Sequence, residues 1–180
     1  MINYSVKPIA TTFNGVRYRS RLEARWGAFF ELCGWSATYE PFDLGEWTPD
    51  FILHGNTRVL VEVKPILEVD KDTCFKMERS ALKADFHGDL LLVGIVPFVK
   101  TSDGLALGWL GERYTGEEEP CDWGTAVYLG YGLIDFCHGH ANFHGRMTGY
   151  YDGSYEGGDK RFRPLWNEAI NATQWQFNGR

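Results

Sequence analysis

The stretch "WTPDFILHGNTRVLVEVKP", residues 47–65, decides how the first half of the chain folds. Two apolar runs flank a short Gly-Asn-Thr turn, a pattern that predicts two neighbouring β-strands. Asp50, Glu62 and Lys64 interrupt the apolar pattern. A polar group on a buried strand costs free energy unless it is paired, hydrogen-bonded or bound to a metal. These three residues therefore indicate either a functional site or a solvated face of the sheet.

Strand geometry groups the polar residues. Because side chains alternate along a strand, Glu62 and Lys64 share a face, while Val61 and Val63 point to the opposite, apolar side. Asp50 follows a proline at the start of the preceding strand, where the missing N–H is tolerated. Two carboxylates from neighbouring strands, next to a lysine, offer the hard oxygen ligands that Mg²⁺ prefers.

A helix is predicted over residues 20–34. Ser20 is placed as its N-cap, Glu23 three residues later completes a capping box, and Gly34 marks the end. At 100° per residue, Glu23 lies about 100° from Leu22, at the edge of the apolar stripe, and is therefore aimed near the sheet. Glu31 faces water. The stripe consists of Leu22, Trp26, Phe29, Phe30 and Cys33.

The remaining elements complete an α, β, β, β, α, β order. Strands are predicted over 36–45, 48–54 and 58–65, a second helix over 71–86, and a strand buried on both faces over 89–97. Beyond residue 97 we predict strand-like segments at 104–113 and 125–136, a glycine-rich stretch at 139–158 and a helix at 164–175. No linker separates the halves, so residues 1–180 are predicted to form a single α/β domain.

Pro49-Asp50, followed by Glu62-Val63-Lys64 and preceded by Glu23 on a helix, resembles the PD-(D/E)xK nuclease superfamily. The segments "YRSRLEARWGAFF" and "EPFDLGEWTPDF" look like those of small nucleases encoded by bacteriophages and mobile elements. The resemblance implies a restriction-endonuclease-like αβββαβ core with a mixed central sheet over about residues 18–97. Residues 98–180 would form a β-rich and helical C-terminal extension.

The resemblance also implies a chemistry. A protein of this superfamily hydrolyses phosphodiester bonds, most often in DNA, with Mg²⁺ or with Mn²⁺ in its place. Asp50, Glu62 and the backbone carbonyl of Val63 would bind the metal ion, and Glu23 would complete the site or bind a second ion. Lys64 would orient or deprotonate the attacking water and offset the charge that builds on phosphorus. The partner implied is a nucleic acid.

Two other interpretations stay open. In the first, Glu62 and Lys64 are an ordinary surface pair, Asp50 is a turn residue and Glu23 serves only the helix cap. In the second, the chain is a catalytically inactive nuclease-fold protein of phage origin. Such a protein would bind DNA, or would bind a protein and block a host defence complex.

Charge is unevenly distributed along this acidic chain of net charge −6. Residues 1–35 contain five basic and two acidic residues, for a net charge of +3, whereas residues 101–125 have a net charge of −5. Such asymmetry permits a local basic surface that holds a phosphate backbone. On the second helix the basic residues share a side next to a Phe75, Leu82 and Phe86 cluster, and a solvated helix face explains them equally well. The candidate nucleic-acid-binding residues are Arg17, Arg19, Arg21 and Arg25 around Glu23, and Lys76, Arg79 and Lys83 on the second helix.

Cysteine and histidine spacing gives a weaker signal. Cys137, His140 and His144 have zinc-like spacing, but no second ligand pair follows, so loop histidines are the expected interpretation rather than a zinc site. The four cysteines form no C-x-x-C pair and are interpreted as reduced thiols. Trp166 and Trp175 are expected to be core residues.

The sequence also allows predictions of the cellular location and the oligomeric state of the protein. The N-terminal residues do not show the pattern of a signal peptide, and no apolar run of about 18 residues exists, so we expect a cytoplasmic protein with no membrane contact. Cleavage of both strands of a duplex would favour a homodimer with two sites. No heptad repeat or exposed apolar helix in the sequence indicates one.

Overall fold

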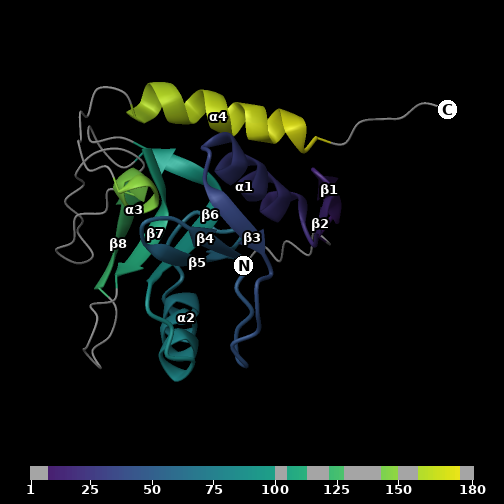
Figure 1. The fold of residues 1–180 in the computed structure, drawn as a ribbon. Helices are drawn as coiled ribbons and strands as arrows, with labels where there is room; N and C mark the ends of the chain where they lie inside the picture. The colour runs from purple at the N-terminus through teal and green to yellow at the C-terminus, as the bar shows by residue number, and fades with distance from the viewer. Residues whose placement is uncertain (1–7, 100–104, 113–121, 128–142, 150–157, 175–180) are drawn as a thin grey trace.

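The computed structural model describes residues 8–99, 105–112, 122–127, 143–149 and 158–174 (Figure 1). Its centre is a six-stranded sheet in which every neighbouring pair of strands is antiparallel except β5 and β6, which are parallel. The sheet is therefore mixed. Its strands follow the order β3 (Ser36–Tyr39), β4 (Phe51–His54), β5 (Arg58–Val63), β6 (Asp89–Val99), β7 (Leu105–Glu112) and β8 (Asp122–Val127).

Helices cover both faces of this sheet (Figure 1). On one face lie α1 (Arg21–Leu32) and α4 (Gly158–Ala172), and on the other lies α2 (Lys71–Lys83). A short helix, α3 (Phe143–Thr148), contributes Phe143 and Met147 to the core on the α1 side. The mixed α/β class that the sequence predicts is confirmed.

Alternation along β5 divides the core into two layers. Val59, Val61 and Val63 pack in the cluster that contains α1, whereas Leu60 packs in the cluster that contains α2. Glu62 shares the face of Leu60, as the sequence predicts. The polar residues therefore lie at the end of a strand whose two faces are both covered.

Helix α1 follows its sequence signals. The Ser20 hydroxyl accepts a hydrogen bond from the Glu23 backbone N–H at 3.1 Å, and Gly34 ends the helix region with a φ of +73°. Trp26 is fully buried, and its indole N–H donates to the Gly94 carbonyl on β6 at 2.9 Å. This bond fixes α1 against the middle of β6.

The predicted α, β, β, β, α, β order is present as α1, β3, β4, β5, α2 and β6. β5 and β6 are parallel, so the chain must cross over between them, and α2 forms that crossover. β7 continues the same sheet by antiparallel pairing with β6, and β8 by antiparallel pairing with β7. The carboxyl-terminal half of the chain therefore extends the sheet begun by the first half.

Several elements differ from the prediction. A hairpin of β1 (Thr11–Phe13) and β2 (Val16–Tyr18) precedes α1 and was not predicted. Its turn places Asn14 and Gly15 at φ values of +45° and +78°, and an Asn-Gly pair is the usual signal for such a turn. Helix α3 lies in the stretch interpreted as glycine-rich loop. α4 begins six residues before the predicted start and contains Pro164.

The packing face of α2 also differs from the predicted one. Phe75 and Leu82, predicted to cluster with Phe86, are 58% and 50% exposed. The buried side chains of the helix include Cys74, Met77 and Ala81. Their spacing of three and four residues forms the stripe that packs against the sheet. Phe75 and Leu82 are not part of this stripe, so α2 exposes these two apolar side chains.

No helix within the described residues is long and apolar enough to cross a membrane.

The corrected face of α2 predicts a contrast between two substitutions. Met77→Ala should lower the free energy of unfolding by about 2–4 kcal/mol, because it leaves a cavity in a fully buried position. Phe75→Ala should change it by less than about 0.5 kcal/mol, because an exposed side chain loses little contact. Urea denaturation followed by circular dichroism measures both values, and the opposite ranking would contradict the observed face.

Candidate active site at the end of the central sheet

A cavity of about 500 Å³ opens where β5 ends. Glu23, Asp50, Glu62 and Lys64 all line it, together with Val63. The structure thus brings the four predicted catalytic residues to one place, although they come from α1, from the residue before β4, from β5 and from the residue after β5.

The pairing of β4 with β5 explains why two carboxylates meet. Phe51 pairs with Val61 at the end of the antiparallel ladder, and one step further the same register sets Asp50 opposite Glu62. Side chains directly opposite each other on antiparallel strands are close neighbours. Asp50 is 4% exposed and Glu62 is 5% exposed, so neither is a surface residue. The interpretation of Glu62 as part of an ordinary surface pair is therefore wrong.

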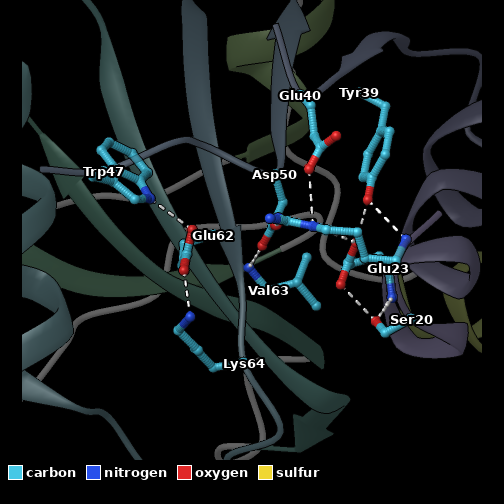
Figure 2. A network of polar contacts seen from close by, with 10 residues as sticks. Ser20, Glu23, Tyr39, Glu40, Trp47, Asp50, Glu62, Val63 and Lys64 are labelled. Carbon is cyan, nitrogen blue, oxygen red and sulfur yellow. Dashed lines mark hydrogen bonds and ion pairs between the residues drawn. The ribbon is translucent and has the colours of Figure 1, made fainter. Parts of the chain in front are cut away.

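Glu62 is held by two donors (Figure 2). The indole N–H of Trp47 donates to Oε2 at 2.6 Å, and the Lys64 ammonium lies 2.5 Å from Oε1. Trp47 is itself buried in the loop before β4, so its donor is fixed in place. The contact of Lys64 with Glu62 agrees with the predicted shared face of the two side chains.

Asp50 is also held through both oxygens. Oδ1 accepts from the Arg19 guanidinium at 2.6 Å, and Oδ2 accepts from the Val63 backbone N–H at 2.7 Å. The Asp50 carbonyl in turn accepts from the Glu40 backbone N–H at 2.8 Å, which closes the loop between β3 and β4. Asp50 therefore connects that loop to the end of β5.

Glu23 belongs to the helix cap and to the site at once (Figure 2). Oε1 accepts from the Ser20 hydroxyl at 2.7 Å, and Oε2 accepts from the Tyr39 hydroxyl at 2.5 Å. Arg19 links this group to Asp50, because its Nε lies 3.8 Å from Glu23 Oε2. The predicted alternative, in which Glu23 serves only the cap, accounts for one of these contacts and not for the others.

Arg19 is the central cation of the network. Its guanidinium contacts Asp50, and its Nε lies 2.8 Å from Glu40 Oε1. Burial alone would lower the pKa of Arg19, but the hydrogen bond with Tyr39 and the surrounding carboxylates raise it, so the guanidinium is permanently charged. Burial and the hydrogen bond to Glu23 raise the pKa of Tyr39, so its hydroxyl keeps its proton.

The Asp50 carboxyl has the most perturbed acidity in the cavity. Burial raises the pKa of Asp50 to about 7, and the negative charges of Glu62 and Glu23 act in the same direction. The Val63 N–H and Arg19 oppose this rise without cancelling it. The buried carboxylates thus have more negative charge than Arg19 and Lys64 compensate.

The donor set fits a hard divalent cation by its chemistry, since it consists of carboxylate oxygens beside a strand backbone. Val63 directs its N–H to Asp50, and the carbonyl of an extended residue points to the same edge of its strand as the N–H. Within the described residues, however, no three His, Cys, Asp or Glu side chains are grouped as a metal site. Each carboxylate is instead turned to protein donors, so binding a cation would require Arg19 and Lys64 to release them.

The predicted nucleic-acid-binding residues fall into distinct environments. Lys76 is exposed on α2 and lines the cavity. Arg79 and Lys83 form ion pairs with Glu46 at 2.8 and 2.5 Å, which hold the loop before β4 against α2 and lower the pKa of Glu46. Arg17 is exposed on β2, and the remaining two, Arg21 and Arg25, lie on α1 outside the cavity lining.

The other sequence signals lie mostly away from the site. Cys137 and His140, of the zinc-like spacing, fall outside the described residues, and His144 falls in α3. Cys33 and Cys74 are free thiols, as predicted. Trp166 is buried with its ring 4.7 Å from that of Trp26, which confirms its predicted core position, whereas Trp175 lies outside the described residues.

Trp47 and Tyr39 were missed by sequence reasoning, although each donates to a carboxylate of the site. Trp47 lies two residues before Pro49 in a polar loop, and a tryptophan needs a partner for its N–H when it is buried. The sequence therefore indicates that the Trp47 N–H needs an acceptor, but it does not indicate which acceptor. Tyr39 ends β3 and has no signal beyond strand propensity.

Comparison with known protein families, with curated proteins and with solved structures finds no match to this chain. The geometry of the cavity is therefore what any functional inference must rest on.

The raised pKa of Asp50 predicts how stability depends on pH without divalent cations. Because the folded protein holds this proton up to about pH 7 and the unfolded chain loses it near pH 4, the contribution of Asp50 is fully present below pH 4 and is lost as pH rises through 7. Between pH 5 and 8 it should fall by about 2–3 kcal/mol. Denaturation of wild type and Asp50→Asn in EDTA measures this difference, and parallel pH profiles would contradict it.

Proposed function

We propose that the chain is a Mg²⁺-dependent endonuclease that hydrolyses phosphodiester bonds, with DNA as its substrate. The observation that carries this proposal is the convergence of Glu23, Asp50, Glu62 and Lys64 on one cavity at the end of β5. The element order and the parallel β5–β6 crossover support a restriction-endonuclease-like core. Continuous pairing from β3 to β8 supports a single domain that includes the extension.

Asp50, Glu62 and the Val63 carbonyl would hold the metal ion, and Glu23 would complete the site. A bound Mg²⁺ supplies Lewis acidity, which stabilises charge on the attacking and leaving oxygens and favours ionisation of a bound water. The buried, partly protonated Asp50 suits this role, because its ionised form is disfavoured until a cation compensates it. Trp47 would keep Glu62 oriented through its N–H bond to Oε2.

Lys64 supplies a mobile cation. Its ammonium contacts Glu62 Oε1, yet the side chain is 40% exposed, so it can leave the carboxylate without unfolding the strand. Once released, its N–H groups can orient the attacking water and donate to the phosphate, which offsets the charge built up in the transition state. Its position two residues after Glu62 on the same strand face keeps it close to both groups.

Arg19 has a different role from Lys64. Its ion pair with the buried Asp50 holds the cavity together in the absence of another cation. The Arg19 side chain is 55% exposed, so its guanidinium can turn toward solvent, where a phosphate oxygen would be a new partner of suitable geometry. Lys76 on α2 also lines the cavity and adds a positive charge there. The cavity volume of about 500 Å³ lies within the range of sites that bind a nucleotide-sized group.

A second function is favoured by the neutralised state of the site. Asp50 and Glu62 are both paired with protein cations, and the described residues contain no preassembled metal site. A catalytically inactive nuclease-fold protein that binds DNA or another protein would be stable in this arrangement. The two functions differ in whether the carboxylates exchange their partners for a divalent cation.

Cleavage assays separate the two functions. Wild type should cleave single-stranded, duplex or branched DNA in Mg²⁺ or Mn²⁺, and Lys64→Ala should lower the rate by about 100-fold or more, because a transition-state donor is lost. Asp50→Asn should abolish cleavage while preserving side-chain size. Lys71→Ala, at the exposed start of α2, is the matched control and should cleave like wild type.

Thermal unfolding of each variant establishes that losses of activity are not losses of fold. RNA of the same sequence tests the choice of substrate. If wild type cleaves none of these nucleic acids in either metal, the endonuclease proposal is wrong and the binding function replaces it.

A further inference from the structure

Two arginines on α1 have no partner in the part of the chain that the structure describes. Arg21 is the first residue of the helix and Arg25 lies one turn later, so the two side chains are neighbours on the helix surface. The Nε atoms of both are buried and have no hydrogen-bond partner. Among the described residues, no carboxylate pairs with either guanidinium.

This arrangement is costly for the protein alone. A buried N–H group without an acceptor loses its hydration without replacement. Like charges one helical turn apart also repel each other. Burial, and then the positive charge of Arg21, lowers the pKa of Arg25, which reflects the same unfavourable environment.

The pair lies apart from the carboxylate cavity. At 100° per residue, Arg21 and Arg25 each lie about 160° around the helix from Glu23. Neither lines the cavity, whereas Glu23 does. The two regions are therefore separated by roughly one helix diameter, about 10–12 Å. A strand must instead follow the helix surface, a path of about 14–17 Å, which at a rise of about 3.4 Å per nucleotide corresponds to roughly four or five nucleotides.

We propose that Arg21 and Arg25 form a seat for a backbone phosphate of the nucleic acid strand whose scissile bond lies in the carboxylate cavity. This inference rests on the proposed function for the identity of the strand. Two guanidinium groups offer paired N–H donors that match phosphate oxygens. An anion placed there supplies the acceptors and the negative charge that this part of α1 lacks.

The seat also sets the minimum length of a substrate that can contact it. A mononucleotide in the cavity would not contact Arg21 or Arg25, whereas a strand extending several nucleotides past the scissile bond would. Binding energy from this remote contact would help to fix the register of the strand at the cavity. Inorganic phosphate and a phosphodiester both present anionic oxygens, so both should bind at the seat. Only binding of the phosphodiester should affect the affinity for nucleic acid.

The test uses the full chain in EDTA, so that no cleavage occurs. Fluorescence anisotropy with labelled 30-nucleotide single-stranded and duplex DNA measures affinity for wild type, Arg21→Gln, Arg25→Gln and the double variant. The double variant should bind at least about tenfold more weakly, and its slope of log K against log salt should fall by roughly 1.4 for single strands. Arg58→Gln, which removes one positive charge at the other end of β5, is the control for each single variant and should stay near wild type.

Thermal shift in inorganic phosphate gives a second readout. Phosphate should raise the melting temperature of wild type and of Arg58→Gln but not of the double variant. In the absence of phosphate, Arg25→Gln should melt no lower than wild type, because a repulsive charge is removed. This keeps the test valid if the double variant folds poorly.

The outcomes separate this inference from the proposed function. If the double variant binds DNA as Arg58→Gln does, the seat is wrong, even if the phosphate response is lost and even if wild type is an active nuclease. If the double variant loses DNA affinity and wild type cleaves nothing with metal, the seat is supported and the catalytic proposal alone fails.

Discussion

The repulsion among three buried carboxylates governs the structure at the end of the central sheet. Glu23, Asp50 and Glu62 border one cavity, and burial deprives them of the water that would screen their charges. Each must therefore find donors within the protein. Arg19, Lys64, Trp47, Tyr39, Ser20 and the Val63 N–H supply them. Even with these donors, the Asp50 carboxyl is disfavoured in its charged form, and its pKa is raised.

Such an arrangement costs stability, so its presence calls for a compensating function. Packing alone would be served better by apolar residues at these positions, because burying paired charges is rarely favourable overall. A divalent cation would remove the repulsion and leave Arg19 and Lys64 free for an anionic substrate. The same exchange explains why the two cations have exposed side chains while the carboxylates are buried.

Much of this geometry could be predicted from the sequence because it depends on local periodicity. Alternation along β5 sets Glu62 and Lys64 on one face, and the capping box at Ser20 fixes where Glu23 begins its helix. Long-range contacts were not predictable in the same way. The assignment of Arg19 to Asp50, and of Trp47 to Glu62, depends on how the β3–β4 loop folds back. The face of α2 was misread because small residues such as Ala81, rather than Phe75, form its packing stripe.

Calorimetric titration of Mn²⁺ into the metal-free protein measures whether the buried carboxylates exchange their protein cations for a divalent metal ion. We expect binding that strengthens from pH 6 to pH 8, as Asp50 gives up its proton, and that is lost in both Asp50→Asn and Glu62→Gln. If wild type binds no Mn²⁺, or if binding persists unchanged in both variants, the carboxylates do not make this exchange.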